Sequence, residues 1–365
     1  MKIIITTILI SVLCLIKKNN KILFVIALLW LWLLMAFSDG NADAIINEGR
    51  YYNYSNTVGI TEPGYYLLMQ TFMRMGVSFA LYKQIIAAIE IILIGSTIFK
   101  LSSSPNVVLA LYALYPFCLD VVQMRFTLAL SIVIFAIRYL FPDNTTKSMI
   151  TRDVIFVILI VAASMFHFVA IFYLLLLIGK HLSMKATVTF VAMVNIIGFA
   201  LFNPYSLLII AKYVGIESKV VAYLNRPTSG KVLILTLLSI VIYIVTFTIT
   251  YAFSIRFIRL QRISDRDFVG IKSNIISLCI IPFLVVAPDF LRILTGLSIL
   301  NYITISNHLS SHRVNLRNFS FSPNNVLLII LLYITAFANL YKLVLGNANY
   351  YTVFLPLFFS NTLIR

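Results

Sequence analysis

The sequence predicts an all-α polytopic integral membrane protein. Of its 365 residues, 61% are hydrophobic and only 11% are charged, a composition far from that of a soluble domain. Apolar runs such as residues 231–255 are long enough to cross a bilayer as a helix, at about 20 residues per crossing. The runs are continuous rather than alternating, which favours helices over a barrel.

Apolar segments follow one another along the chain, and we expect roughly 11–14 transmembrane or re-entrant helices in one transmembrane domain, residues 1–365. The segments are 3–16, 22–37, 64–82, 84–99, 105–119, 126–141, 153–178, 186–202, 231–255, 273–287, 289–306, 325–341 and 348–362. The first resembles a signal peptide, but no small-residue cleavage site follows it, and lysines lead into the second run. We therefore interpret it as the first transmembrane helix.

Basic residues give the predicted orientation. Residues 256–272 carry five basic residues against two aspartates, so we place this loop in the cytoplasm. The lysines within 17–21 give a second anchor on the same side. Loops 38–63 and 203–230 are then outer loops. Loops of this kind explain the formal charge of +16, and no nucleic-acid partner is expected.

Both basic loops can lie on the cytoplasmic side only if two of the apolar segments do not cross the membrane exactly once. Segment 64–82 is interrupted at Met73-Arg74-Met75-Gly76, so we expect it to be re-entrant or to lie along the outer interface. Segment 153–178 is long for one crossing, and we expect a division near His167 into two half-length helices.

The motifs of several enzyme classes are missing from the sequence. Cys14, Cys118 and Cys279 lie in apolar runs without metal-ligand spacing, so we interpret them as packing residues. No Walker loop, HExxH or GxSxG pattern occurs, so an ATPase, a zinc enzyme and a serine hydrolase lose support. We expect neither a metal site nor a cofactor.

Arg125 lies in VVQMRFTLAL, residues 121–130, at the start of an apolar helix. A charged residue at membrane depth costs about 2.5–3.5 kcal/mol on insertion scales, so it is expected to face a cavity or a partner. The plain structural explanation is a snorkelling arginine paired with Asp120. Other polar residues on the predicted outer face favour a functional role.

The loop before segment 64–82 combines charged residues with tyrosines. Its charged residues include Glu48, Arg50 and Glu62. The nearby tyrosines are Tyr51, Tyr52, Tyr54, Tyr65 and Tyr66. Such a surface is typical of a membrane interface. It also suits sugars, because aromatic rings stack on pyranose C–H surfaces and carboxylates accept hydroxyl protons. Composition leaves both readings open.

Further candidates lie elsewhere in the sequence. His167 lies inside an apolar segment and is either a structural residue, a donor to phosphate or a proton acceptor. Glu90 is either a proton-relay carboxylate of a transporter or, as we favour, a neutral or paired residue of the bundle. Arg226 and Arg292 lie on the predicted outer side, and arginines match the oxygens of phosphate.

Three stretches share their order and spacing with a known family. ITEPGYYLLMQTFMRMGVSF at 60–79 has an acidic-Pro-Gly-Tyr segment and then Gly-x-Ser-Phe. DVVQMRFTLALSIVIFAIRYL at 120–140 has Arg-x-x-Leu-Ala, and SMFHFVAIFYLLL at 164–176 has a histidine after small residues. Together they resemble the Wzy-type bacterial polysaccharide polymerases, and more closely their EpsG-like branch.

One position departs from that family pattern. The family commonly has Arg-Gln, whereas Phe126 follows Arg125 here and Gln123 precedes it by two residues. Two residues separated by one position do not share a helix face, so we do not expect Arg125 and Gln123 to act together in one bidentate contact.

The resemblance implies a glycosyltransferase C-like membrane architecture in the bacterial inner membrane. It implies an enzyme that joins undecaprenyl-pyrophosphate-linked repeat units on the outer face, alongside a flippase and a chain-length regulator. On this hypothesis Arg125, Glu62 and His167 are catalytic. The substrate-binding residues would be Arg50, Tyr65, Tyr66, Asp120, Gln123, Arg226 and Arg292. The product would be O-antigen, capsule or exopolysaccharide.

Other function classes remain open from the sequence. A flippase of lipid-linked oligosaccharide would require polar residues in both leaflets and an internal repeat. The polar set instead gathers on one predicted side, and no repeat is visible. An O-antigen ligase or an acyltransferase could use the same kind of scaffold and would differ in its acceptor.

Overall fold

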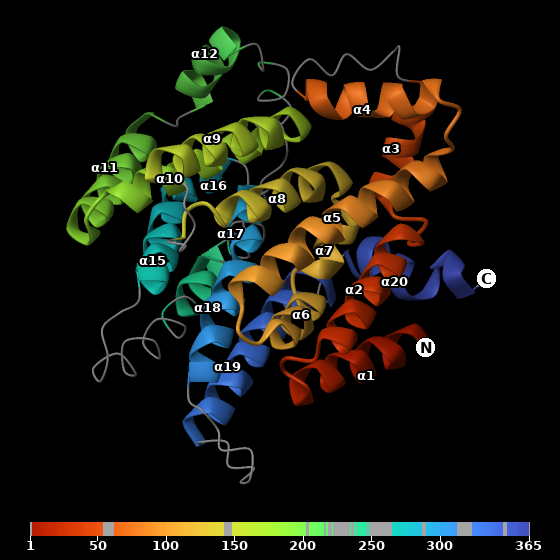
Figure 1. Ribbon diagram of the computed structural model, residues 1–365. Coiled ribbons are helices and arrows are strands. Elements are labelled where there is room, and N and C mark those ends of the chain that lie inside the picture. The colour runs from red at the N-terminus through yellow and green to blue at the C-terminus, as the bar shows by residue number, and fades with distance from the viewer. Residues whose placement is uncertain are drawn as a thin grey trace. The chain divides into compact units, whose positions relative to one another are not determined.

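The computed structural model describes most of the chain as helix (Figure 1). It describes residues 2–53, 62–141, 148–201, 204–214, 265–286, 290–311, 323–345 and 349–364, with 240–246 and a few single positions between 215 and 264. These residues contain no strand, which confirms the predicted all-α class.

Three described helices are long and apolar enough to cross a membrane: α5 (Phe79–Leu101), α9 (Met149–Phe166) and α11 (Met184–Leu201). A bent pair, 330–345 with 350–359, would make a fourth. Shorter apolar helices accompany them, which fits a polytopic membrane protein. The number of crossings stays a prediction.

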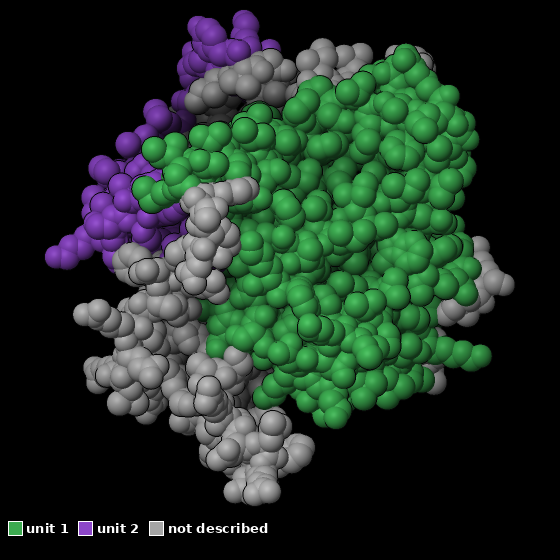
Figure 2. All heavy atoms as spheres, in the orientation of Figure 1, with its two compact units in different colours: residues 1–139, 146–171, 298–365 green, residues 140–145, 172–297 purple. Residues whose placement is uncertain are grey.

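The chain divides into two compact units, coloured green and purple in Figure 2. Unit 1 comprises residues 1–139, 146–171 and 298–365, and unit 2 comprises residues 140–145 and 172–297. The helices that carry the candidate site belong to unit 1.

Unit 1 begins with α1 (Lys2–Ile16) and α2 (Lys21–Ala36), as the first two apolar runs predict. The side chain of Asn20 caps α2 by accepting a hydrogen bond from the Leu23 N–H group. The predicted outer loop 38–63 is not simply a loop, because it contains α3 (Ala42–Tyr52). Asn41 caps this helix, whose polar residues had made the segment look like a connection.

The predicted break at Met73–Gly76 is confirmed. Helix α4 (Pro63–Arg74) ends there, and Gly76 adopts a φ of +72°, a left-handed conformation that glycine tolerates well. With 12 residues, α4 is about 18 Å long and too short to cross the bilayer core. Its expected boundary with the next segment was wrong, because α5 already begins at Phe79.

Helix α8 (Met124–Ile137) is the central helix of unit 1 and packs on α5 and α9 (Figure 1). It is buried on most of its surface, as expected for a helix that is apolar on all sides. Two short helices precede it, α6 (Pro105–Leu114) and α7 (Phe117–Val122). The predicted segment 105–119 is therefore divided where Pro116 interrupts the helix.

The long segment 153–178 is divided at His167, as predicted, but not into two half-length helices. Helix α9 has 18 residues, about 27 Å, and is long enough to cross by itself. A 3₁₀ helix, η2 (Phe168–Leu174), and α10 (Leu175–His181) follow it.

Unit 2 contains α11, α12 (Pro204–Val214), α15 (Asp265–Ser277), η3 (Leu278–Ile280), α16 (Ile281–Val286) and α17 (Leu291–Gly296). Helix α10 approaches α15 closely at Gly179, where an added Cβ would lie 3.4 Å from the Ile276 Cβ. Lys272 ties the two segments by donating to the carbonyls of Lys180 and Leu182. The predicted loops 203–230 and 256–272 thus contain helical residues at 204–214 and 265–272, and most of their remaining residues lie outside the described ones.

The last part of unit 1 starts with α18 (Ser298–Ser311) and α19 (Pro323–Leu340). Two π-helical turns, η5 (Tyr341–Leu345) and η6 (Tyr350–Phe354), lead to α20 (Leu355–Phe359) and η7 (Thr362–Ile364). Asn361 fixes this end by donating to the Leu34 carbonyl at the end of α2.

Candidate active site

Glu62 lies directly before α4, where the helix starts with proline at its first turn. Gly64 then allows an unusually close approach of α4 to the end of α9. A Cβ at Gly64 would lie 2.8 Å from the Met165 Cβ and 3.1 Å from its carbonyl oxygen. The absence of a side chain at this point therefore brings the start of α4, with Glu62, to the end of α9.

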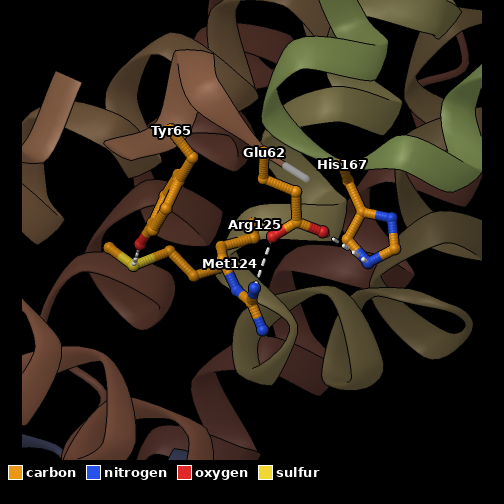
Figure 3. A network of polar contacts seen from close by, with 5 residues as sticks. All are labelled: Glu62, Tyr65, Met124, Arg125 and His167. Carbon is orange, nitrogen blue, oxygen red and sulfur yellow. Dashed lines mark hydrogen bonds and ion pairs between the residues drawn. The ribbon is translucent and has the colours of Figure 1, made fainter. Parts of the chain in front are cut away.

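Arg125 and Glu62 form an ion pair, although 63 positions separate them in the sequence (Figure 3). The Arg125 Nη1 atom donates to Glu62 Oε2 at 2.5 Å. The Arg125 side chain is 32% exposed, against 11% for Glu62, so the guanidinium keeps access to solvent or to a ligand. The carboxylate side chain makes no capping hydrogen bond to α4 and is available for this pair.

His167 approaches the same carboxylate from the opposite side (Figure 3). Its Nε2 atom lies 3.9 Å from Glu62 Oε1, which is ion-pair range for a protonated histidine but too long for a hydrogen bond. The ring also makes an edge contact with Phe126, with 5.4 Å between ring centroids. Glu62 therefore lies between an arginine and a histidine, with one oxygen toward each.

Helix dipoles affect these three charges differently. The N-terminus of α4 favours the carboxylate of Glu62, and the C-terminus of α9 favours a protonated His167. Arg125 lies in the first turn of α8, where the dipole disfavours a cation. Glu62 supplies the compensating negative charge.

Arg50 of α3 adds a second guanidinium to this region. Its pKa is lowered from the usual arginine value, first because it is partly buried and then because the Arg125 charge repels it, while Glu62 opposes the shift. Arg50 and Arg125 thus act electrostatically on each other, and Glu62 and Asp43 both act on Arg50. Guanidinium groups match phosphate oxygens, so an anionic phosphate is a suitable ligand for these arginines.

The tyrosines are more buried than a sugar-binding surface requires. Tyr65 is 2% exposed, and its hydroxyl donates to the Met124 sulfur at 3.3 Å. Tyr51 is also buried, and its hydroxyl donates to the Val77 carbonyl. These two belong to an aromatic core with Tyr82, so the expected role of Tyr65 in substrate contact is corrected to one of packing. Tyr66 is half-buried.

Asp120 is not the partner of Arg125. It is buried, and its Oδ2 atom accepts a hydrogen bond from the Tyr112 hydroxyl at 2.9 Å, while its carbonyl accepts one from Thr127. The snorkelling pair and a direct substrate contact by Asp120 are therefore both corrected. Gln123 is half-buried and forms the joint between α7 and α8.

The roles of the two remaining candidate arginines stay predictions. Arg292 lies in α17 of unit 2, whereas Glu62, Arg125 and His167 belong to unit 1. Arg226 and Tyr54 lie outside the described residues. Within the part of the chain that the structure describes, no group of three His, Cys, Asp or Glu residues could hold a metal ion.

Sequence reasoning missed the contact between Gly64 and Met165. The signal was present in part, because a Pro-Gly pair at the start of a helix marks a place where backbone can approach closely. Nothing in the sequence said which segment would approach. The partner became visible only with the placement of α9.

The fold and the site together define an all-α membrane protein with a carboxylate between basic residues, an arrangement suited to an anionic substrate and to proton transfer. The model of the EpsG family matches residues 21–359, nearly the whole chain, and the chain belongs to that family. This membership suggests a role as a polysaccharide polymerase. No curated protein and no solved structure matches the chain significantly.

Proposed function

We propose that this protein is a membrane glycosyltransferase that polymerises a bacterial polysaccharide. It joins oligosaccharide repeat units carried on undecaprenyl pyrophosphate, at the outer face of the inner membrane. The observation that carries the proposal is the position of Glu62 between Arg125 and His167. A base next to a phosphate-binding arginine is what transfer from a lipid pyrophosphate requires.

In the proposed reaction, the pyrophosphate of the donor binds at Arg125, with Arg50 nearby. The acceptor hydroxyl oxygen attacks the anomeric carbon of the donor sugar, and the bond from that carbon to the phosphate oxygen breaks. The lipid pyrophosphate leaves with the electron pair, and the arginines stabilise its charge. Glu62 accepts the proton of the acceptor hydroxyl.

His167 has a supporting role in this scheme. Its Nε2 atom lies near the Glu62 oxygen that Arg125 does not bind. When pyrophosphate engages Arg125, the carboxylate loses its strongest partner and becomes a better base. A neutral His167 can then take the proton onward, and a protonated one would hold Glu62 in place.

The distribution of basic residues supports an outer location of the site. Arg125 lies at the start of α8, and Arg138 lies at its other end. Arg152, at the start of α9, donates to the carbonyl of Arg138. Lys100 lies in the last turn of α5, and Thr97 of the same helix accepts a hydrogen bond from Arg138. Basic residues are enriched at cytoplasmic helix ends, so the site would face outward.

The decisive experiment supplies purified protein with lipid-linked repeat units alone. Glycans longer than one unit are expected from the wild type, and the Arg125→Lys variant should lose them because a point charge cannot reproduce the guanidinium fork. Unchanged units with active, folded protein would contradict the proposal and point to a carrier. Transfer to lipid A but not to another repeat unit would indicate a ligase.

A parallel test in the native host replaces Arg125 by Ala and by Lys. We expect long-chain glycan to disappear in both, with the protein still present in the membrane. Persistence of long chains in both variants would contradict the catalytic assignment. Analysis of the surface polysaccharide after deletion of the gene identifies the sugars concerned.

A further inference from the structure

A small cavity lies within unit 1, beside the candidate site. Its volume is about 20 Å³, enough for one water molecule or a small ion, which needs roughly 10–15 Å³. Helices α2, α3, α5, α7 and α8 contribute to its wall. Its polar lining residues are Asn41, Asn47, Lys83 and Glu90, and Met124 of α8 also lines it.

Two side-chain oxygens at this cavity are buried without a hydrogen-bond partner. Glu90 is 2% exposed and Asn47 is 3% exposed. Among the described residues, no donor reaches Glu90 Oε1 or Asn47 Oδ1. A buried acceptor left unsatisfied carries a desolvation penalty, which is larger when the group is charged, so a ligand that contacts these oxygens would relieve it.

Among the described residues, no donor, cationic or neutral, reaches the buried Oε1 atom of Glu90. Asp120, a second buried carboxyl, interacts electrostatically with Glu90. The Tyr112 hydroxyl donates to Asp120 and leaves Glu90 uncompensated. Two adjacent buried carboxyl groups disfavour each other's ionisation and favour a bound cation or proton.

Lys83 also lines the cavity, but its ammonium group is engaged elsewhere. It donates a hydrogen bond to the Ser38 carbonyl, and the charges with which it interacts are those of Asp39 and Glu48. Its charge is therefore compensated at the end of the cavity nearest the α2–α3 connection.

We propose that the cavity binds a monovalent alkali cation, with Na⁺ as the test ion, through the Glu90 carboxylate and the Asn47 amide oxygen. Hard cations prefer oxygen ligands and complete their shell with water. A single carboxylate neutralises a monovalent ion, whereas a divalent ion would leave excess charge at membrane depth. The ion would tie α3, which carries Arg50, to α5. This inference does not rest on the proposed polymerase activity.

The test measures thermal unfolding of the full-length protein in detergent, in NaCl, KCl or choline chloride at equal ionic strength. The melting temperature of the wild type should rise with the alkali cation and saturate, because a ligand of the native state stabilises it by mass action. The Glu90→Gln variant should lose this rise, and Asn47→Leu should shift its midpoint to higher cation concentration. The Glu217→Gln variant, which removes an exposed carboxylate of unit 2 that does not line the cavity, should keep it.

The wild-type titration decides the matter even if Glu90→Gln does not fold. A melting temperature that is the same in alkali and choline salts would overturn the proposal. A melting temperature that changes with pH but not with the cation would also overturn it and show that a proton occupies Glu90. An equal rise in Glu90→Gln would place the ion at another site.

Discussion

Helix α8 carries an arginine at each end, and the two differ in their partners. Arg138 lies at the C-terminal end, where its guanidinium donates to the hydroxyls of Thr97 and Ser96 and lies 4.3 Å from the centre of the Phe135 ring. Arg125 lies at the N-terminal end and pairs with the carboxylate of Glu62.

The helix dipole explains this difference. A cation at a helix C-terminus gains about 0.3–1 kcal/mol, so neutral hydroxyls and a ring are sufficient partners for Arg138. The same cation at the N-terminus is disfavoured and requires a counter-charge. Arg125 lies at a helix end that disfavours a cation, and Glu62 at the start of α4 supplies the carboxylate that compensates it. Such an arrangement indicates a functional role rather than a stabilising one.

The largest expected effect comes from replacing each arginine by glutamine. Arg125→Gln should lower the polymerisation rate by about 10³–10⁵-fold, because it removes the group that stabilises the leaving pyrophosphate. Arg138→Gln should instead lower stability, by about 1–3 kcal/mol, with little change in turnover per folded protein. Initial rates and thermal unfolding of both variants give the comparison, and equal rate losses would contradict it.

Glu62→Gln tests the carboxylate half of the pair. We expect kcat to fall by about 10²–10⁴, because a general base is lost, while KM for the donor stays the same or falls because Arg125 is freed. Rates at a series of donor concentrations separate the two constants. Glu48→Gln serves as the control and should behave as wild type. A raised KM with unchanged kcat would show that Glu62 binds substrate without accepting a proton.

The Gly64→Ala variant tests how the site is assembled. The added Cβ would overlap Met165, so α4 must move from α9, with a cost of about 1–3 kcal/mol and reduced activity. Gly49→Ala is a matched control, since a Cβ there meets nothing within 4 Å and should stabilise α3 by about 0.4–1 kcal/mol. Thermal unfolding and polymerisation assays of both variants check this. We expect Gly64→Ala to lose stability and activity and Gly49→Ala to gain stability, and the same change in both variants would contradict the close contact.

The smallest effect is expected from Tyr65→Phe. The variant loses only the hydrogen bond to the Met124 sulfur, worth about 0.5–1.5 kcal/mol, and keeps the ring in the aromatic core. Polymerisation should stay within about tenfold of the wild type, which corresponds to 1.4 kcal/mol. A loss as large as that of Glu62→Gln would return Tyr65 to the substrate-binding residues.

Much of the fold follows from local features of the chain. Composition predicts the all-α membrane class. The break near Gly76 follows from a glycine in a left-handed turn. The division near His167 follows from the length of its segment, which exceeds one crossing. The individual candidates Glu62, Arg125 and His167 were visible as polar residues in apolar or aromatic surroundings. Helix α3 was missed because its polar composition resembles a connection, and α12 was missed because its apolar run of 11 residues is too short for a crossing.

The sequence by itself determined that this is a helical membrane protein. It also determined which few polar residues lie in apolar surroundings, where their burial costs enough free energy to indicate a function. Only the tertiary structure decided how they pair. Arg125 pairs with Glu62 rather than with Asp120, Asp120 accepts a hydrogen bond from Tyr112, and Tyr65 is buried in the core. The physical reason is that the contacts of Glu62 and Tyr65 depend on where α4 packs, and α4 meets α9 at Gly64, about 100 positions before Met165, a contact that no local pattern encodes. The bond from Tyr112 to Asp120 depends instead on the chain reversal between α6 and α7.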